Sequence, residues 1–215
     1  MKIMSDSDYI VIGDFDSSST CMLWLHGYGA NNWSFEPTIK LIETKLDGKL
    51  SAILPNAPMI NGKRSWFPLP YKTDSDKLNE DCEGLIHAID NIYIFINKFK
   101  NKIDSKKFLI GGFSQGAALT LAIMCDARAK IDGYISISGY MPCRNIFNKK
   151  MLNEEKLFIA HGEKDDVINI AAHIETVEFL KNIGVKPIEN IGSYGHTIPN
   201  VVIDQVANWL LKNYL

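Results

Sequence analysis

Short apolar runs alternate with longer amphipathic segments along most of this chain. The apolar runs have the length of β-strands and are bounded by glycine, proline or polar residues. Several, such as residues 21–25, are apolar at every position, which is typical of strands covered on both faces in a parallel sheet. Pro187 interrupts the last run, which favours a sheet edge or the start of a strand over a central position. The predicted strands are 8–12, 21–25, 50–54, the run that begins at Phe108, 133–138, 156–160 and 185–191.

The amphipathic segments between these runs have the period of α-helices. The clearest covers residues 81–100, where apolar side chains recur every three or four positions. Ile94 and Phe95 fall outside that stripe and are candidates for contact with a second surface, including that of a homodimer. The other predicted helices are 35–45, the segment from the turn at Ser114 to about Ala127, 169–183 and 198–214.

This alternation predicts an α/β fold with a mostly parallel central sheet and helices on both faces. No repeat, low-complexity stretch or linker interrupts it, so residues 1–215 are expected to form a single domain. The chain is 46% hydrophobic. A domain of this size buries roughly 70–75% of its unfolded surface, so it should need no disulfides to fold.

Charge and cysteine usage limit the classes of partner and the cellular compartment that we expect. The net charge is −2, and lysine and arginine are spread along the chain, which argues against a nucleic-acid partner. The four cysteines lack metal-site or C-x-x-C spacing, and Cys21 and Cys125 lie in apolar runs, as expected of buried thiols in a reducing compartment. The first residues lack the apolar core of a signal peptide, and no apolar run approaches bilayer length. We therefore expect a cytoplasmic protein without stable membrane insertion.

The stretch around Ser114 carries the clearest chemistry. An apolar run leads into Gly112-Phe113-Ser114-Gln115-Gly116, and an Ala/Leu-rich helical segment follows. A serine in so tight a strand–turn–helix is crowded by backbone on both sides, which glycines two positions away relieve. The turn presents the hydroxyl beyond the sheet, and the amide of Gln115 can point at an oxyanion. The pattern alone would occur by chance in about one chain in twenty of this length, so its meaning depends on its partners.

Two loops after later predicted strands supply such partners. They are residues 161–167, which hold several acids, and residues 192–198, which hold His196. Loops after parallel strands meet at one edge of the sheet, so an acid from the first loop should lie near His196 and Ser114. Serine, acid, histidine is also the chain order of the α/β-hydrolase triad. The candidate acids are Asp165, Asp166, Glu163 and Glu189.

Further motifs occur in a fixed order from about residue 20 to the C-terminus. They are Leu25-His26-Gly27-Tyr28-Gly29, Asn56-Ala57-Pro58 with Ser65-Trp66-Phe67, Gly112–Gly116, His161-Gly162-x-x-Asp165-x-Val167 and Gly195-His196. Together they resemble the phospholipase/carboxylesterase group of α/β hydrolases, which includes acyl-protein thioesterases and lysophospholipases. The resemblance implies that Ser114 is the nucleophile, Asp165 the orienting acid and His196 the base. It also implies that the backbone amides of Tyr28 and Gln115 hold the oxyanion.

The proline-rich segment 55–79 has no clear period and is long for a compact domain, which is typical of a functional loop. Residues 59–80 depart from the family pattern, so acyl-chain length and substrate size do not follow from the resemblance. Trp66 and Phe67 in this segment, together with Met141, are candidates for the wall of an acyl pocket.

The remaining histidines are interpreted as structural. His26 and His161 each end a predicted strand and are expected to hydrogen-bond loop backbone. His87 and His173 lie in predicted helices, as surface or packing residues. No pair of histidines has metal-site spacing alongside Asp or Glu, so neither a metal nor another cofactor is expected.

The sequence thus predicts a carboxylic-ester or thioester hydrolase that works through an acyl-enzyme. A small acyl ester, a lysophospholipid or an acylated protein would each fit such a site, and fold and triad do not choose among them. A serine peptidase or amidase would use the same triad and remains an alternative. A dienelactone-hydrolase-like enzyme usually carries cysteine where this chain has Ser114. A non-catalytic binding protein on this fold should lack a triad member or an elbow glycine, and none is missing.

Overall fold

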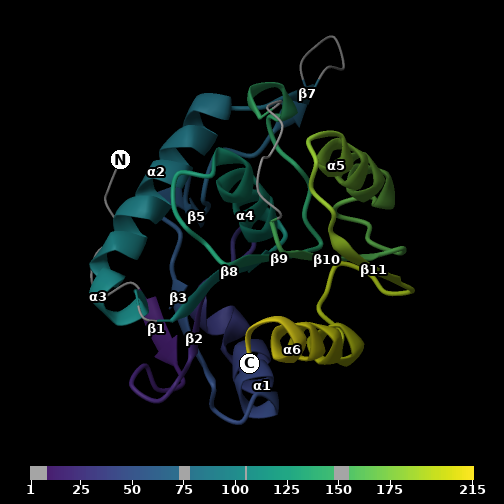
Figure 1. Cartoon of the computed structure of the whole chain (residues 1–215). Helices are drawn as coiled ribbons and strands as arrows, with labels where there is room; N and C mark the ends of the chain where they lie inside the picture. Colours follow the sequence, from purple (N-terminus) through teal and green to yellow (C-terminus); the bar gives the residue numbers. More distant parts are fainter. Residues whose placement is uncertain (1–8, 73–77, 105, 148–154) are drawn as a thin grey trace.

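The centre of the molecule is a seven-stranded sheet, seen in a computed structural model that describes residues 9–72, 78–104, 106–147 and 155–215. The strand order is β1-β3-β2-β8-β9-β10-β11 (Figure 1). Strand β1 pairs antiparallel with β3, and every other pair is parallel, which confirms the predicted mostly parallel sheet. The strands are β1 Tyr9–Ile12, β2 Thr20–Leu25, β3 Leu50–Pro55, β8 Lys107–Phe113, β9 Gly133–Ile137, β10 Leu157–Gly162 and β11 Ile188–Gly192.

The burial of each strand follows its sequence pattern. Strands β2, β3 and β10 are buried at every position, as expected of apolar runs covered on both faces. Strand β11 is partly or fully exposed along its length and follows directly on Pro187, which lacks the N–H that a neighbouring strand would need. The edge position predicted for this strand is confirmed.

Helices cover both faces of the sheet (Figure 1). Buried side chains of α2, α4 and α5 join one core cluster, and those of α1 and α6 join a second cluster on the opposite face. None of the helices in the described ranges is long and apolar enough to cross a bilayer. The helices are α1 Glu36–Lys45, α2 Cys82–Lys98, α3 Lys100–Ile103, α4 Gln115–Asp126, α5 Ile170–Asn182 and α6 Asn200–Tyr214, with 3₁₀ turns η1 Asn32–Phe35 and η2 Arg144–Ile146.

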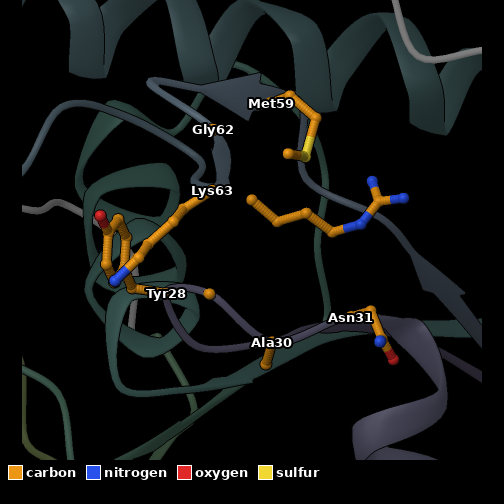
Figure 2. A pocket seen from close by; sticks show the side chains of 8 residues that line it. Tyr28, Ala30, Asn31, Met59, Gly62 and Lys63 are labelled. Atoms are coloured by element: carbon orange, nitrogen blue, oxygen red, sulfur yellow. The ribbon is translucent and has the colours of Figure 1, made fainter.

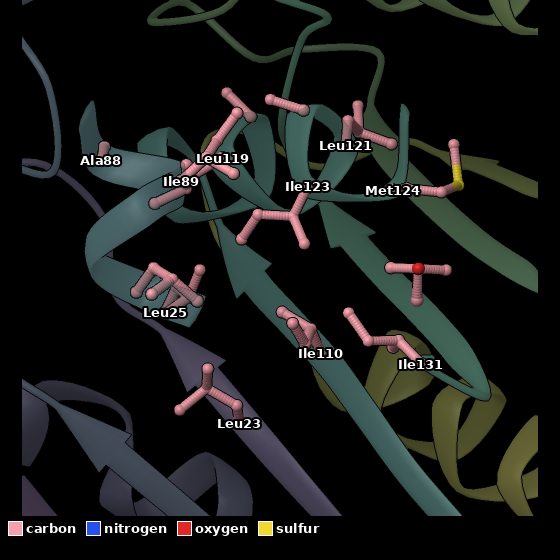
Figure 3. Close-up of a cluster of buried hydrophobic side chains, with 14 of the residues drawn as sticks. Leu23, Leu25, Ala88, Ile89, Ile110, Leu119, Leu121, Ile123, Met124 and Ile131 are labelled. Carbon is pink, nitrogen blue, oxygen red and sulfur yellow. The ribbon is translucent and has the colours of Figure 1, made fainter. Parts of the chain in front are cut away.

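Helix α4 lies deepest of these helices. All its residues from Gln115 to Met124 are buried, and it packs against β8, β9 and α2. Figure 3 shows Leu119 and Ile123 of α4 near Ile89 of α2 and above Ile110 of β8. A helix that is apolar around its whole circumference must be enclosed by other elements, so the start of α4 is held firmly at the sheet edge.

Phe95 of α2 is a core residue. Its side chain is 2% exposed, and its ring meets Tyr9 of β1 edge-on with centroids 5.8 Å apart. Phe95 thus contacts a second surface within its own chain, because the antiparallel edge strand β1 widens the buried face of α2 beyond the apolar stripe. The expectation that Phe95 contributes to a homodimer is wrong, since its side chain is buried. Ile94 is 48% exposed, and its part in a homodimer stays a prediction.

A disulfide between Cys82 and Cys143 ties the start of α2 to the loop after β9. The two cysteines are 61 residues apart in the chain, so their spacing does not indicate the pairing. Cys21 and Cys125 are free, as predicted, and burial raises the pKa of each thiol to about 12. Disulfides are rare in reducing compartments, so the disulfide weighs against the predicted compartment, and cytoplasmic location stays a prediction.

The proline-rich segment leaves the carboxyl end of β3 and contains short hairpin strands. Strand β4 (Met59–Ile60) pairs antiparallel with β5 (Lys63–Arg64), and β6 (Tyr71–Lys72) pairs with β7 (Leu78–Asn79). Residues 73–77, which belong to the predicted functional loop, lie outside the described residues. The segment thus rises from the same edge of the sheet as the loops that follow β2 and β8.

Candidate active site

Ser114 occupies a sharp turn between β8 and α4. Its φ of 56° and ψ of −118° are strained for a residue with a side chain. A Cβ on Gly112 would overlap the backbone of Gly116, and a Cβ on Gly116 would overlap the carbonyl of Leu25 at the end of β2. Glycine is therefore required at both positions. The packing agrees with the steric argument made from the sequence.

The structure brings Ser114, His196 and Asp165 together from the loops after β8, β11 and β10. His196 Nε2 lies 3.0 Å from Ser114 Oγ, and His196 Nδ1 lies 2.7 Å from Asp165 Oδ2. The ring of His196 is also packed against Phe113, with centroids 4.7 Å apart. The result is a continuous hydrogen-bonded chain from a hydroxyl through an imidazole to a carboxylate.

The other candidate acids lie elsewhere. Glu163 and Asp166 are exposed to solvent. Glu189 accepts a hydrogen bond from His173 Nε2 at 2.9 Å. Among the described residues, Asp165 is thus the carboxylate in contact with His196.

Asp165 is buried yet well supplied with hydrogen-bond donors. Burial alone raises the pKa of a carboxyl group, but the hydrogen bonds from His196 and from the backbone amides of Ile168 and Val167 outweigh it, so the pKa of Asp165 is lowered. The amides of Val167 and Ile168 donate to Oδ1 at 3.0 and 2.8 Å. This leaves Oδ2 for His196, and the acid is ionised at neutral pH.

The backbone amides predicted to hold the oxyanion belong to Tyr28, in the turn after β2, and to Gln115, directly after Ser114. A Cβ on Gly27 would lie 3.3 Å from that of Ser114, so the turn after β2 lies directly against the elbow. Gln115 begins α4, where the first N–H groups have no partner within the helix. In the described part of the chain, neither amide donates a hydrogen bond to a residue outside its own element. Both are available to a ligand atom.

Three buried histidines shape the loops without touching Ser114. His26 donates from Nδ1 to Gly27 O at 2.7 Å and accepts at Nε2 from Ala57 N at 3.0 Å, and its burial lowers its pKa to about 4. His161 donates from Nε2 to Ile168 O at 2.7 Å, and its burial also lowers its pKa. His173 packs on His161 with ring centroids 4.9 Å apart. The predicted bonding of His26 and His161 to loop backbone is confirmed.

The side chain of Gln115 has a role that sequence reasoning missed. It is buried, its Oε1 accepts from Trp66 N at 3.0 Å, and its Nε2 donates to Phe67 O at 2.7 Å and Ser65 Oγ at 2.9 Å. One residue therefore offers its amide to the site and fixes the facing segment with its side chain. The sequence did carry a signal for this role, because a polar residue begins a helix that is otherwise mostly apolar.

The residues predicted to line an acyl pocket are all buried. Trp66, Phe67 and Met141 are each at most 3% exposed and belong to the core cluster under α4. Trp66 donates from Nε1 to His26 O at 2.7 Å, and its ring lies 5.0 Å from that of His26. These contacts anchor the segment beside the elbow, and the pocket-wall role of the three residues stays a prediction.

A cavity of about 430 Å³ opens next to Tyr28 (Figure 2). One wall is the turn after β2, and the other is the β4–β5 hairpin. Within the described ranges, no group of three His, Cys, Asp or Glu side chains is arranged to hold a metal ion. The lining residues are Tyr28, Gly29, Ala30, Asn31, Met59, Gly62, Lys63 and Arg64.

Comparison with known proteins finds the same relatives by sequence and by structure. The family model for phospholipases and carboxylesterases matches residues 8–214. Acyl-protein thioesterase 1 of Candida albicans is 30% identical over 203 residues, which cover 86% of this chain and 87% of that protein. Carboxylesterase SOBER1 of Arabidopsis thaliana is 28% identical over 208 residues, or 90% of each chain.

Among solved structures, esterase PE8 has the same fold. It superposes with a TM-score of 0.82 at 19% identity, covering 96% of this chain and 98% of that chain.

Proposed function

Because this chain belongs to the phospholipase/carboxylesterase family of α/β hydrolases and is a carboxylic-ester hydrolase, we propose that Ser114, His196 and Asp165 are its catalytic triad. The observation that carries the proposal is the hydrogen-bonded chain from Ser114 Oγ through both ring nitrogens of His196 to Asp165. A nucleophile, a base within reach of it and an acid that orients the base are what acyl transfer requires.

The first half of the reaction forms an acyl-enzyme. His196 Nε2 takes the hydroxyl proton while Ser114 Oγ attacks the acyl carbonyl carbon. The hydrogen bond from Nδ1 to Asp165 keeps the proton on Nδ1, so Nε2 is the nitrogen free to accept. The ionised Asp165 then stabilises the imidazolium ion that forms.

Charge that develops on the carbonyl oxygen needs donors that are already in place. The amides of Tyr28 and Gln115 fill this role, and losing one such donor typically lowers kcat by about 10²–10³. His196 next gives its proton to the departing alcohol or thiol as the C–O or C–S bond breaks. Water deprotonated by His196 attacks the acyl-serine, releases the carboxylic acid and restores the hydroxyl.

The substrate classes follow from the same site. A small acyl ester, a lysophospholipid or an acylated protein presents a carbonyl that Ser114 can attack. The names of the two relatives, one a thioesterase and the other a carboxylesterase, support both thioester and oxygen-ester cleavage.

Ser114→Ala tests the nucleophile. The variant should fold normally, lose at least about 10⁴-fold in turnover of p-nitrophenyl acyl esters and take no fluorophosphonate label. Hydrolysis is followed by absorbance, labelling by mass spectrometry and folding by circular dichroism. Turnover close to that of the wild type would overturn the assignment.

A matched pair of aspartate variants tests the acid. Asp165→Asn should lower kcat by about 10⁴, because the amide favours the wrong imidazole tautomer. Asp166→Asn, one position along in the same loop and exposed, should stay within about twofold of the wild type, as a surface change does. If the two variants lost activity equally, Asp165 would not be the orienting acid.

A further inference from the structure

We propose that the cavity between the β4–β5 hairpin and the turn after β2 binds an anionic group, phosphate or carboxylate, carried on the alcohol or thiol part of the substrate. The inference rests on the proposed function, because it assigns the cavity to the part of the ester that leaves. Its lining combines two cationic side chains with neutral ones and holds no carboxylate.

The position of the cavity links it to the reacting atoms. Tyr28 lines the cavity and directly follows Gly27, where an added Cβ would lie 3.3 Å from that of Ser114, and under the proposed function its amide is an oxyanion donor. The amide of Gly29 donates to Arg64 O at 2.8 Å, so the hairpin is fastened to the same turn. When the carbonyl oxygen of a substrate accepts a hydrogen bond from the amide of Tyr28, one part of the ester therefore extends into this cavity. That part is either the acyl chain or the alcohol or thiol.

The charge of the lining selects the ligand. Neither Lys63 nor Arg64 forms an ion pair with a carboxylate in the part of the chain that the structure describes. Lys63 Nζ lies 5.5 Å from the ring centroid of Tyr28, and Figure 2 shows the side chain reaching over that ring. Arg64 uses Nη1 to hold Ala57 O at 2.9 Å, which leaves its other N–H groups open. Two uncompensated cations in one hollow favour a phosphate or carboxylate.

Asn31 is a neutral polar residue of the lining. Its Oδ1 accepts from the backbone N–H and the hydroxyl of Ser34, so this oxygen is already engaged and does not repel an anion as a carboxylate would. With a volume of about 430 Å³, the cavity is as large as sites that bind small molecules, which begin at about 300 Å³.

The character of the walls decides which arm of the ester enters. An acyl chain is apolar and gains from buried, apolar surroundings. This cavity is not such an environment, because two of its lining side chains are cationic and several of its residues, including Lys63 and Met59, are exposed. Its occupant is thus the alcohol or thiol part, which leaves into water after the acyl-enzyme forms.

Three esters with the same butyryl chain test the inference. They are the butyryl esters of glycerol, of glycerol 3-phosphate and of glycerate. Their leaving alcohols are neutral in the first case, carry a phosphate in the second and carry a carboxylate in the third. Released butyrate gives kcat/KM for each ester, and the measured quantity is the ratio of each anionic ester to the neutral one. The wild type should favour at least one anionic ester by about tenfold, as expected of two charged contacts of modest strength.

Variants of the lining link any preference to the cavity. Lys63→Gln and Arg64→Gln should each lower the ratio about threefold, and Lys63→Glu should lower it further. Raising the ionic strength to about 1 M, where the Debye length is about 3 Å, should reduce it as well. Lys212→Gln, on exposed α6 surface, is the matched control and should leave the ratio unchanged.

Each outcome separates this inference from the proposed function. A wild type that hydrolyses all three esters without preference overturns the inference and leaves the proposed function standing. A preference that Lys63→Gln, Lys63→Glu and Arg64→Gln all retain also overturns it, because the anionic group then binds elsewhere. A wild type that hydrolyses none of these esters and no p-nitrophenyl ester overturns the proposed function itself.

Discussion

The elbow around Ser114 and the segment 55–72 that faces it are held in place by different kinds of contact. At the elbow, backbone meets backbone, and a Cβ added at Gly112 or Gly116 would overlap main-chain atoms. The segment is held instead by side chains that hydrogen-bond its backbone, those of Gln115 and His26. The elbow therefore tolerates no change of shape, whereas the segment can vary wherever these anchors remain.

This difference separates the region that carries out the reaction from the segment that faces it. The reaction depends on atoms fixed by steric packing, so the same chemistry can be kept while the facing segment changes. Lys63, Arg64 and Met59 belong to the facing segment, because they lie on a short hairpin that is hydrogen-bonded to the turn after β2 through Gly29 N–H and Arg64 O. Under the inference drawn for the cavity, substrate choice would be set by the region with the weaker steric constraint.

A pair of glycine substitutions gives the strongest test of the difference between the elbow and the segment 55–72. Gly116→Ala should destabilise the fold by about 3–5 kcal/mol, the range of severe core mutations, because the new methyl group overlaps the carbonyl of Leu25. Gly62→Ala in the hairpin turn meets no atom and should cost only about 1–2 kcal/mol for its positive φ. Urea unfolding of both variants measures the difference. Equal losses would contradict the division between the two regions.

Gln115 is the next test, because it connects the two regions. Gln115→Ala leaves the buried Trp66 N–H without its acceptor and removes one of the two donors to Phe67 O, which still accepts from Ser65 Oγ, so it should cost about 2–3 kcal/mol. It should also raise the rate of proteolysis within segment 55–72. Gln205→Ala, on partly exposed α6 surface, is the control and should stay within about 0.5 kcal/mol. A Gln115 variant as stable and protease-resistant as this control would show that the segment is held by other contacts.

The smallest predicted effect concerns His26 and pH. Burial lowers the pKa of His26 from an ordinary histidine value of 6.5 to about 4 in the folded chain, so below about pH 6.5 the unfolded chain binds more protons. Stability therefore falls as pH falls, and His26 alone accounts for about 2 kcal/mol between about pH 7 and pH 5. The lowered pKa values of His161 and His173 act in the same direction.

Removal of the titrating ring isolates that contribution. His26→Gln should be less stable than the wild type at pH 7 but should lose about 2 kcal/mol less on going to about pH 5. His87→Gln on the exposed surface of α2 is the control, and its loss should match that of the wild type. Urea unfolding at both pH values gives the numbers. An unchanged loss in the His26 variant would mean that the ring does not resist protonation.

Sequence patterns were most informative where one local property decides the structure. The apolar runs predicted the parallel strands because a strand buried on both faces needs apolar residues throughout. Pro187 predicted the edge position of β11 because it lacks an N–H for the ladder. The homodimer contact expected of Phe95 was wrong because its side chain packs against Tyr9, a residue distant in sequence.

Within the candidate site, the sequence by itself determined the residue types and their order. A glycine pair around Ser114, an acid-rich loop and a final histidine can be read along the chain, since turn geometry and strand order are local properties. The tertiary structure decided which contacts form. The Cys82–Cys143 disulfide and the three bonds of the Gln115 side chain join residues far apart in the chain. Tertiary packing also leaves the neighbouring residues Lys63 and Arg64 in a cavity whose lining holds no carboxylate. Such contacts depend on how whole elements pack, which no short stretch of sequence specifies.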